Sequence, residues 1–139
     1  MSERLQPNQL VIDALRSAGG AVGGDFEGAR LLLTTVGARS RQPRTMPVTY
    51  LPEGERLVVF AANGGRPSHP GWYHNLLADP VARVEVGSET YEVTATEVEG
   101  VERERLWARQ LEHTPYFAGF QERAGRRIPV VALTRAARL

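Results

Sequence analysis

Short apolar runs separated by polar turns dominate the chain after residue 28. Each run has the length of a strand rather than of a helix, and several are rich in β-branched residues. We expect six strands, at Ala29–Val36, Arg44–Leu51, Arg56–Ala62, Val81–Gly87, Glu89–Val98 and Pro129–Leu133. A flat sheet of six short strands would leave exposed edges, so the pattern predicts a mainly β fold whose strands form a closed or half-closed barrel.

Turn and breaker residues refine this prediction. Pro47 cannot donate a hydrogen bond to a β-ladder, which predicts an edge or a bulge at that point of the second strand. The turn "PEGE" leads from the second strand into the third. Gly87-Ser88 lies between the fourth and fifth strands and predicts a hairpin.

Helical spacing occurs in two segments between the strands. Trp72–Ala78 predicts a short helix that ends at Asp79-Pro80. Val101–Leu111 predicts a longer helix whose inward-facing residues are Leu106, Trp107 and Leu111.

The first 28 residues form a separate arm in this prediction, and residues 29–139 form the barrel domain. Apolar residues at helical spacing predict a helix at Asn8–Ala18, and the glycine-rich "GGAVGGDFEG" is typical of a hinge or linker. The arm either packs on the barrel, covers a site as a lid, or makes contact with a membrane surface.

Composition and charge exclude several classes of protein. Net charge is +1 over 139 residues, so no general attraction to nucleic acid is expected, and anion recognition requires a local cluster. The chain has no cysteine, which excludes disulfides and thiolate chemistry. With no apolar run near the ~20 residues of a membrane span and no signal-peptide core, we expect a cytoplasmic protein, at most peripheral to a membrane.

The loop Gly37–Arg44, "GARSRQPR", is the first candidate site. Gly37 can adopt a positive φ angle, and successive backbone N–H groups in such a turn can form an anion-binding nest. Arg39, Arg41 and Arg44 add charge-assisted donors, of which Arg39 and Arg44 could bind phosphate or carboxylate in a forked geometry, and Ser40 adds a hydroxyl. No phosphate-loop or dinucleotide motif accompanies them. The spacing alone leaves an anion-binding loop and a solvated turn as alternatives.

The segment Ala61–Asn75, "AANGGRPSHPGWYHN", is the second candidate. Its small residues would let a flat ligand approach the backbone. Trp72 would then form a wall, and the Asn75 amide would read the edge of the ring. The alternative is a surface loop in which Trp72 and Tyr73 anchor the core.

The third candidate lies in His113–Pro129, where Tyr116, Phe117 and Phe120 cluster at near-helical spacing. They form either a core stripe or a hydrophobic substrate pocket.

Metal chemistry and nucleophilic catalysis are not expected. His69 and His74 are five residues apart with Pro70 between them, whereas paired ligands on one helix use a spacing of three or four. No G-x-S-x-G motif is present, and no pair of carboxylates stands in an apolar context. The pattern instead favours an enzyme that binds a large, flat, anionic cofactor, which would carry the chemistry.

Three stretches resemble the deazaflavin-dependent nitroreductases, which are split β-barrel oxidoreductases that use coenzyme F420. They are "LLLTTVGARSRQPRTMPVTYL", "LVVFAANGGRPSHPGWYHNLLADP" and "RRIPVVAL", and together they span roughly Ala29 to Leu133. The ordered G-G, H-P, W-Y, N-L and D-P pairs make the middle stretch specific. The resemblance implies a six-stranded, FMN-binding-like split β-barrel of the α+β class that binds F420, with FMN less favoured.

The resemblance also implies site residues. In the family, the loop after the first strand follows approximately T-T-x-G-R-K-S-G-x-P-R and holds the phosphate and glutamate tail of the cofactor. Arg39, Ser40 and Arg44 inherit that role. Ala38 stands at a basic position of the pattern and Arg41 at a glycine. The other residues matched to cofactor contacts are Pro47, Val48, Thr49, Phe60, Ala61, Ala62, Asn63, Gly71, Trp72, Tyr73, His74 and Asn75.

The implied activity is hydride transfer from reduced F420 to a conjugated acceptor such as a quinone, an enone or a nitroaromatic. Tyr116, Phe117 and Phe120 would form the acceptor pocket. Because a phenyl ring cannot hydrogen-bond a developing negative charge, Tyr116 is the candidate proton donor beside solvent, and nitroimidazole reduction is not expected. The alternative is a non-catalytic carrier of a deazaflavin, FMN or a lipid-like ligand. The sequence leaves both a monomer and a homodimer open.

Overall fold

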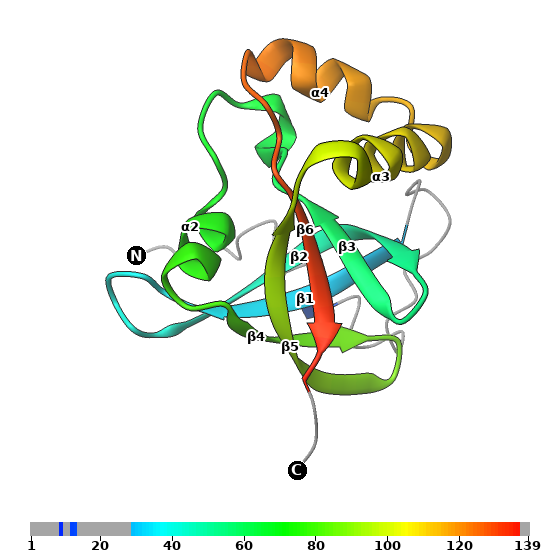
Figure 1. Cartoon of the computed structure of the whole chain (residues 1–139). Coiled ribbons are helices and arrows are strands. Elements are labelled where there is room, and N and C mark those ends of the chain that lie inside the picture. The colour runs from blue at the N-terminus through cyan, green and yellow to red at the C-terminus, as the bar shows by residue number, and fades with distance from the viewer. Residues whose placement is uncertain (1–8, 10–11, 14–28, 137–139) are drawn as a thin grey trace.

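The computed structural model of the protein describes residues 9, 12–13 and 29–136 (Figure 1). The helix expected at residues 8–18 and the linker after it lie outside the described residues, apart from Gln9, Ile12 and Asp13, which are helical. Within the described part of the chain, no helix combines the length and apolar character that crossing a membrane requires.

Six antiparallel strands close into a barrel. They are β1 (Ala29–Val36), β2 (Pro43–Glu53), β3 (Arg56–Phe60), β4 (Val81–Val86), β5 (Glu89–Val98) and β6 (Val130–Arg135). The order around the barrel is β1-β2-β3-β6-β5-β4, and β4 pairs back to β1. The predicted barrel is therefore confirmed, and so is the hairpin at Gly87-Ser88, which joins β4 to β5.

The barrel has two apolar cores, which explains why the runs of β3 and β6 are continuously apolar. Leu57 and Val59 of β3 face the barrel interior, together with Val131 and Leu133 of β6. The alternate residues of the same strands, such as Val58, belong to a second cluster with Leu106 and Trp107. Strands that are buried on both faces need apolar residues at every position.

Helices cover one end of the barrel and one side. The helical elements are η1 (Asn63–Gly65), α2 (Gly71–Ala78), α3 (Gly100–His113) and α4 (Phe117–Ala124). Figure 1 shows α3 and α4 together at one end, and α2 beside the β1–β2 loop. The sequence indicates only a near-helical aromatic spacing where α4 forms. Gly125 ends this helix with a φ of 63°, the left-handed conformation that often terminates helices.

Several strand boundaries differ from the prediction by one or two residues, and two of these differences, at the ends of β2 and β3, have clear local causes. β2 continues through Glu53 because the turn is confined to Gly54-Glu55. β3 ends at Phe60, since the Ala62 N–H bonds back to the Phe60 carbonyl at 2.8 Å and turns the chain out of the sheet. The edge position expected for Pro47 is confirmed, because β3 joins β2 only from Tyr50 onwards.

η1 approaches α4 so closely that Gly65 has no room for a side chain. Its φ is 85°, and a Cβ there would lie 3.2 Å from both the Phe120 Cα and the Arg123 Nε. We expect Gly65→Ala to destabilise the protein by about 2–4 kcal/mol, from backbone strain plus overpacking. Gly64→Ala is the matched control: its φ of 65° is similar, but its Cβ would meet no atom within 4 Å.

Urea denaturation of the two glycine variants measures this difference. The control should lose only about 1 kcal/mol, which is the strain of a left-handed alanine. Equal losses in both variants would show that the close approach of η1 to α4 contributes nothing to stability.

Candidate functional site

Two adjacent cavities open between the β1–β2 loop, the start of α2 and the start of α4. The loop cavity, of about 770 Å³, is lined by Thr35, Gly37, Ala38, Arg39, Ser40, Arg44, Met46, Gly71, Trp72, His74 and Asn75. The aromatic cavity, of about 330 Å³, is lined by Arg30, Met46, Pro47, Val48, Thr49, Phe60, Ala62, Asn63, Gly64, Pro70, Trp72, Tyr116, Phe117 and Phe120. Met46 and Trp72 line both, so the cavities share a wall.

The loop cavity is electropositive. Arg39 and Arg44 are exposed at its rim, and no carboxylate is among the described residues that line it. α2 begins at this cavity with Gly71 and Trp72, and has no acidic residue in its first turn. The positive end of the helix dipole adds to the field of the arginines. The cavity is therefore suited to an anionic group.

The β1–β2 loop uses several of its own backbone donors internally, so fewer of them remain for an anion-binding nest, which stays a prediction. Gly37 N–H donates to the Gln42 carbonyl at 2.8 Å, and Arg41 N–H donates to the Gly37 carbonyl at 2.9 Å. Gln42 N–H donates to the Ser40 hydroxyl at 3.1 Å. An anion in this loop would therefore be held chiefly by the arginine side chains, and Ser40 shapes the loop.

Glycine is needed at position 37 for space, and the left-handed residue of the loop is Arg41. A Cβ on Gly37 would lie 2.5 Å from the Ser40 hydroxyl oxygen. Arg41 has a φ of 60°, whereas Gly37 does not have a positive φ. This explains why a glycine suits position 41 in the family pattern. Arg41 does not line the loop cavity, although it lies between two arginines that do.

Asn75 ties the loop to α2. Its Oδ1 accepts a hydrogen bond from Ala38 N–H at 2.9 Å, and its Nδ2 donates to the Thr35 hydroxyl at 3.0 Å. Both ends of the amide bond to the protein, which gives Asn75 a positioning role in the loop. The expectation that this amide also reads the edge of a bound ring stays a prediction. Sequence spacing does not reveal this contact, since the partners lie 37 and 40 residues apart.

The aromatic cavity brings together most of the other expected residues. Pro47, Val48 and Thr49 of β2 face Tyr116, Phe117 and Phe120 at the start of α4 across the cavity, with Ala62 and Asn63 from the turn after β3. Tyr116, which lines this cavity, is 44% exposed. All three aromatic residues line the cavity, and Phe117 is also part of a core cluster. Their role as a substrate pocket stays a prediction.

Sequence reasoning missed several lining residues. They are Thr35 and Met46 in the loop cavity, and Arg30 and Met46 in the aromatic cavity. Gly37, Ala38, Gly64 and Pro70 also line the cavities and lie within the candidate segments, without being among the individually predicted contacts. Arg30 is detectable in principle, because it pairs with Thr49 in the β1–β2 ladder. That register follows only once the loop length between the strands is known.

Tyr73 and Ala61 line neither cavity, in contrast to the expectation. Tyr73 follows Trp72 on α2, and consecutive helical residues point about 100° apart. The Tyr73 hydroxyl donates to Glu97 at 2.5 Å, and burial, together with this carboxylate, raises the pKa of Tyr73 to about 12. Ala61 is fully buried in the barrel core. Neither side chain is placed to touch a ligand of the two cavities.

His69 lies beside Tyr73, and its pKa is lowered by burial and by the neighbouring Arg126, with a smaller effect of His74 that Glu97 opposes. A histidine with a lowered pKa contributes stability that is present above its ordinary value of 6.5 and lost as the pH falls below it. We expect urea midpoints to fall more between pH 7.5 and 5.5 in the wild type than in His69→Gln. If the urea midpoints of the two proteins depend on pH in the same way, the pKa of His69 is not lowered by folding.

Comparisons with known proteins agree with this geometry. Residues 8–135 match the family model described as F420H(2)-dependent quinone reductase. An F420H(2)-dependent quinone reductase of Mycobacterium tuberculosis is 41% identical over 125 residues, which cover 86% of this chain and 84% of that protein.

Solved structures agree as well. One described as an F420-H2 dependent reductase has a TM-score of 0.69 and 37% identity, and the match covers 75% of this chain and 92% of that one. Another, described as a domain-swapped dimer, has a TM-score of 0.71 and 32% identity over 92% of this chain and 99% of that one. The family match spans nearly the whole chain, and the barrel is the fold of these structures. The chain therefore belongs to the F420H(2)-dependent quinone reductase family.

Proposed function

We propose that the two cavities together bind coenzyme F420 and that the protein transfers hydride from its reduced form to a quinone. The observation that carries this proposal is the shared wall of Met46 and Trp72. It joins a cationic cavity free of carboxylates, among its described residues, to an aromatic-lined cavity with a wall of small residues. A ligand with an anionic tail and a flat ring system matches both halves.

The donor set fits the cofactor. Arg39 and Arg44 supply charge-assisted donors for a phosphate or carboxylate tail. Ser40 and Asn75 hold the loop that carries these arginines. Ala62 and Gly64 present little side chain along the aromatic cavity, which lets a ring lie against the backbone.

The chemistry balances as a two-electron reduction. The reduced cofactor supplies a hydride, and the quinone takes this hydride and one proton to become a quinol. The residues of the chain orient both partners, and proximity of this kind is worth up to about 7–11 kcal/mol of barrier. We propose that the Tyr116 hydroxyl or solvent donates the proton, because Tyr116 lines the aromatic cavity and remains exposed. Its hydroxyl is also suited to hydrogen-bond the quinone oxygen as negative charge develops there.

Fluorescence titration with F420 and with FMN tests the cofactor assignment. We expect saturable binding of F420 and weak binding of FMN. Preferential binding of FMN would assign the two cavities to a flavin. Menaquinone and a nitroimidazole assayed side by side test the acceptor, and we expect the quinone to be reduced faster. The alternative function, a carrier, predicts binding of F420 without turnover of either acceptor.

A further inference from the structure

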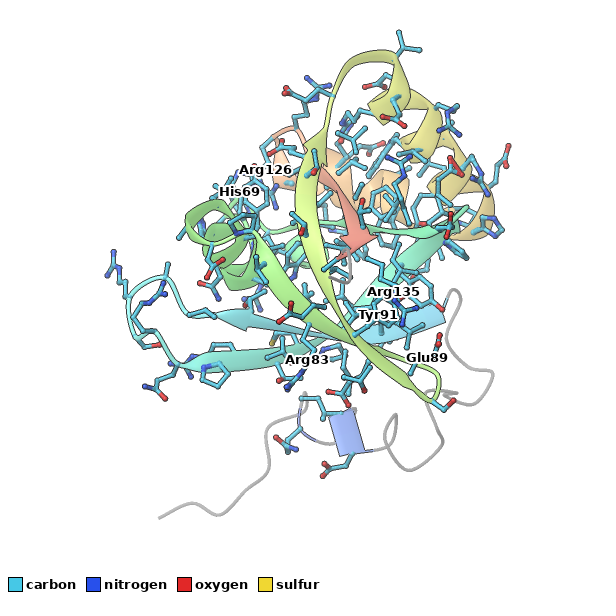
Figure 2. The ribbon with its side chains drawn as sticks, turned by 60° about the horizontal axis from the view of Figure 1, so that its bottom comes forward. His69, Arg83, Glu89, Tyr91, Arg126 and Arg135 are labelled. Carbon is cyan, nitrogen blue, oxygen red and sulfur yellow. The ribbon has the colours of Figure 1, made fainter. Side chains whose placement is uncertain are left out.

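The guanidinium group of Arg126 forms hydrogen bonds along one segment of the chain, residues 61–69. It lies in the connection between α4 and β6, beside His69 (Figure 2). Its Nη2 donates to the carbonyls of Ala61 and Ala62 at 3.2 Å and of Ser68 at 2.9 Å. Its Nε donates to the Arg66 carbonyl at 3.2 Å, and its Nη1 lies 2.9 Å from the His69 Nδ1. All five acceptors lie within residues 61–69.

The segment held in this way is unusual in its backbone. Asn63, Gly64 and Gly65 have φ angles of 52°, 65° and 85°, so three consecutive residues are left-handed. A left-handed conformation is unfavourable for a residue with a side chain and persists where surrounding contacts hold it. The Asn63 side chain donates to the Ser68 carbonyl at 3.0 Å, and Arg126 donates to the same carbonyl.

This segment is also a wall of the proposed ring site. Ala62, Asn63 and Gly64 line the aromatic cavity. Arg126 donates to the carbonyl of Ala62. It also donates to the carbonyl of Ser68, to which the Asn63 side chain is bonded. The position of the wall therefore depends on contacts to a side chain that does not itself line the cavity.

Arg126 links this wall to the opposite one. α4 ends two residues before Arg126 and carries Phe117 and Phe120 on the acceptor side of the cavity. Gly65 packs against Phe120 and Arg123 of the same helix. The distance between the ring wall and the acceptor wall is thus set by one packed unit that consists of α4, Arg126 and residues 61–69.

We propose that Arg126 is a positioning residue for hydride transfer, which sets the spacing between the cofactor ring and the acceptor by holding residues 61–69 against α4. This proposal rests on the proposed function. Arg126 lines neither cavity, and its donors are engaged by carbonyls and by His69. Its removal should therefore affect the rate of the chemical step more than the binding of the anionic tail, which lies in the loop cavity.

The matched variants are Arg126→Ala and Arg127→Ala, with Arg126→Lys as the conservative replacement. Arg127 has the same charge and is the next residue, but its described ion pair is a 3.6 Å contact with Glu104 at the surface. We expect Arg126→Ala to lower kcat per folded protein by about 10- to 100-fold, because a misplacement of about 1 Å has effects of that size. The Kd of F420 should change by less than about threefold, which is under 1 kcal/mol. Arg126→Lys should recover part of kcat, and Arg127→Ala should match the wild type.

Two readouts test the same contact without turnover. Amide hydrogen exchange in residues 61–69 should accelerate in Arg126→Ala and not in Arg127→Ala. The pKa of His69, followed by NMR, should rise in Arg126→Ala, because both the adjacent cation and part of the burial are removed. These measurements need no cofactor, so they remain decisive for the contact if the wild type fails to oxidise F420H2, a result that would instead overturn the proposed function.

Three results would overturn the proposal. Unchanged kcat per folded protein in Arg126→Ala, with only a lower melting temperature, would make the residue merely structural. An equal loss of kcat in Arg127→Ala would make the effect one of net charge. If Arg126→Ala does not fold, Arg126→Lys decides: a kcat equal to that of the wild type would contradict the need for the forked donor geometry of arginine.

Discussion

Replacing Arg39 and Arg44 together with alanine is expected to weaken F420 binding by roughly 30- to 150-fold. Each arginine offers a charge-assisted hydrogen bond to the anionic tail, and such bonds contribute about 1.5–3 kcal/mol each when well formed. Both residues are exposed, so solvent screening reduces the pair to about 2–3 kcal/mol. The weakening should itself diminish at high salt, because part of the interaction is screened.

Arg41→Ala is the control for this double substitution. Arg41 lies in the same loop and is equally exposed, but it does not line the loop cavity. We expect fluorescence titration to give a Kd within about threefold of the wild type, which is under 1 kcal/mol. If Arg41→Ala weakens binding as much as the double variant does, the loop acts through its total charge. If the double variant binds F420 normally, the tail lies elsewhere.

Replacing Trp72 with alanine is expected to have the largest effect on the fold and the site together. The side chain is 7% exposed, belongs to the barrel core and forms the shared wall of both cavities. Truncation of a buried tryptophan lowers the free energy of unfolding by about 3–5 kcal/mol. It also removes an aromatic surface next to the ring, which should weaken F420 binding by roughly tenfold.

Leu76→Ala separates the two effects. Leu76 lies one turn later on α2, is buried in the same core cluster and lines neither cavity. It should lose about 2–5 kcal/mol of stability with little change in the Kd of F420 per folded protein. Urea denaturation and fluorescence titration measure the two quantities. If Trp72→Ala is mostly unfolded, Trp72→Phe is measured instead. An unchanged Kd of F420 in Trp72→Phe would show that Trp72 does not contribute to the binding site.

The strands could be predicted because the burial of each strand is reflected in the pattern of apolar residues within its own short stretch of sequence. Leu57–Phe60 of β3 and Val130–Leu133 of β6 are continuously apolar because both faces are covered there, and Pro47 marks the stretch of β2 that β3 does not reach. The closure of the barrel follows from strand length and number. The end of β3 could not be predicted, because Ala61 and Ala62 continue the apolar run while the backbone has already turned.

The site could be predicted in outline but not in its contacts. Cationic and aromatic residues are visible in the sequence, and Arg39, Arg44 and Phe120 do line the cavities. The orientation of Tyr73 away from them depends on the angle of α2 relative to the barrel. The bridging role of Asn75 likewise depends on a partner far along the chain.

The most direct test of the proposed activity is an anaerobic reaction of F420H2 with a menaquinone analogue and catalytic amounts of the protein. Quinol and oxidised F420 are measured together. We predict one quinol formed for each F420H2 consumed, over many turnovers, at a rate that the Arg39→Ala, Arg44→Ala double variant lowers at subsaturating cofactor. Saturable F420H2 binding with no quinol formed would contradict the account and would identify a carrier.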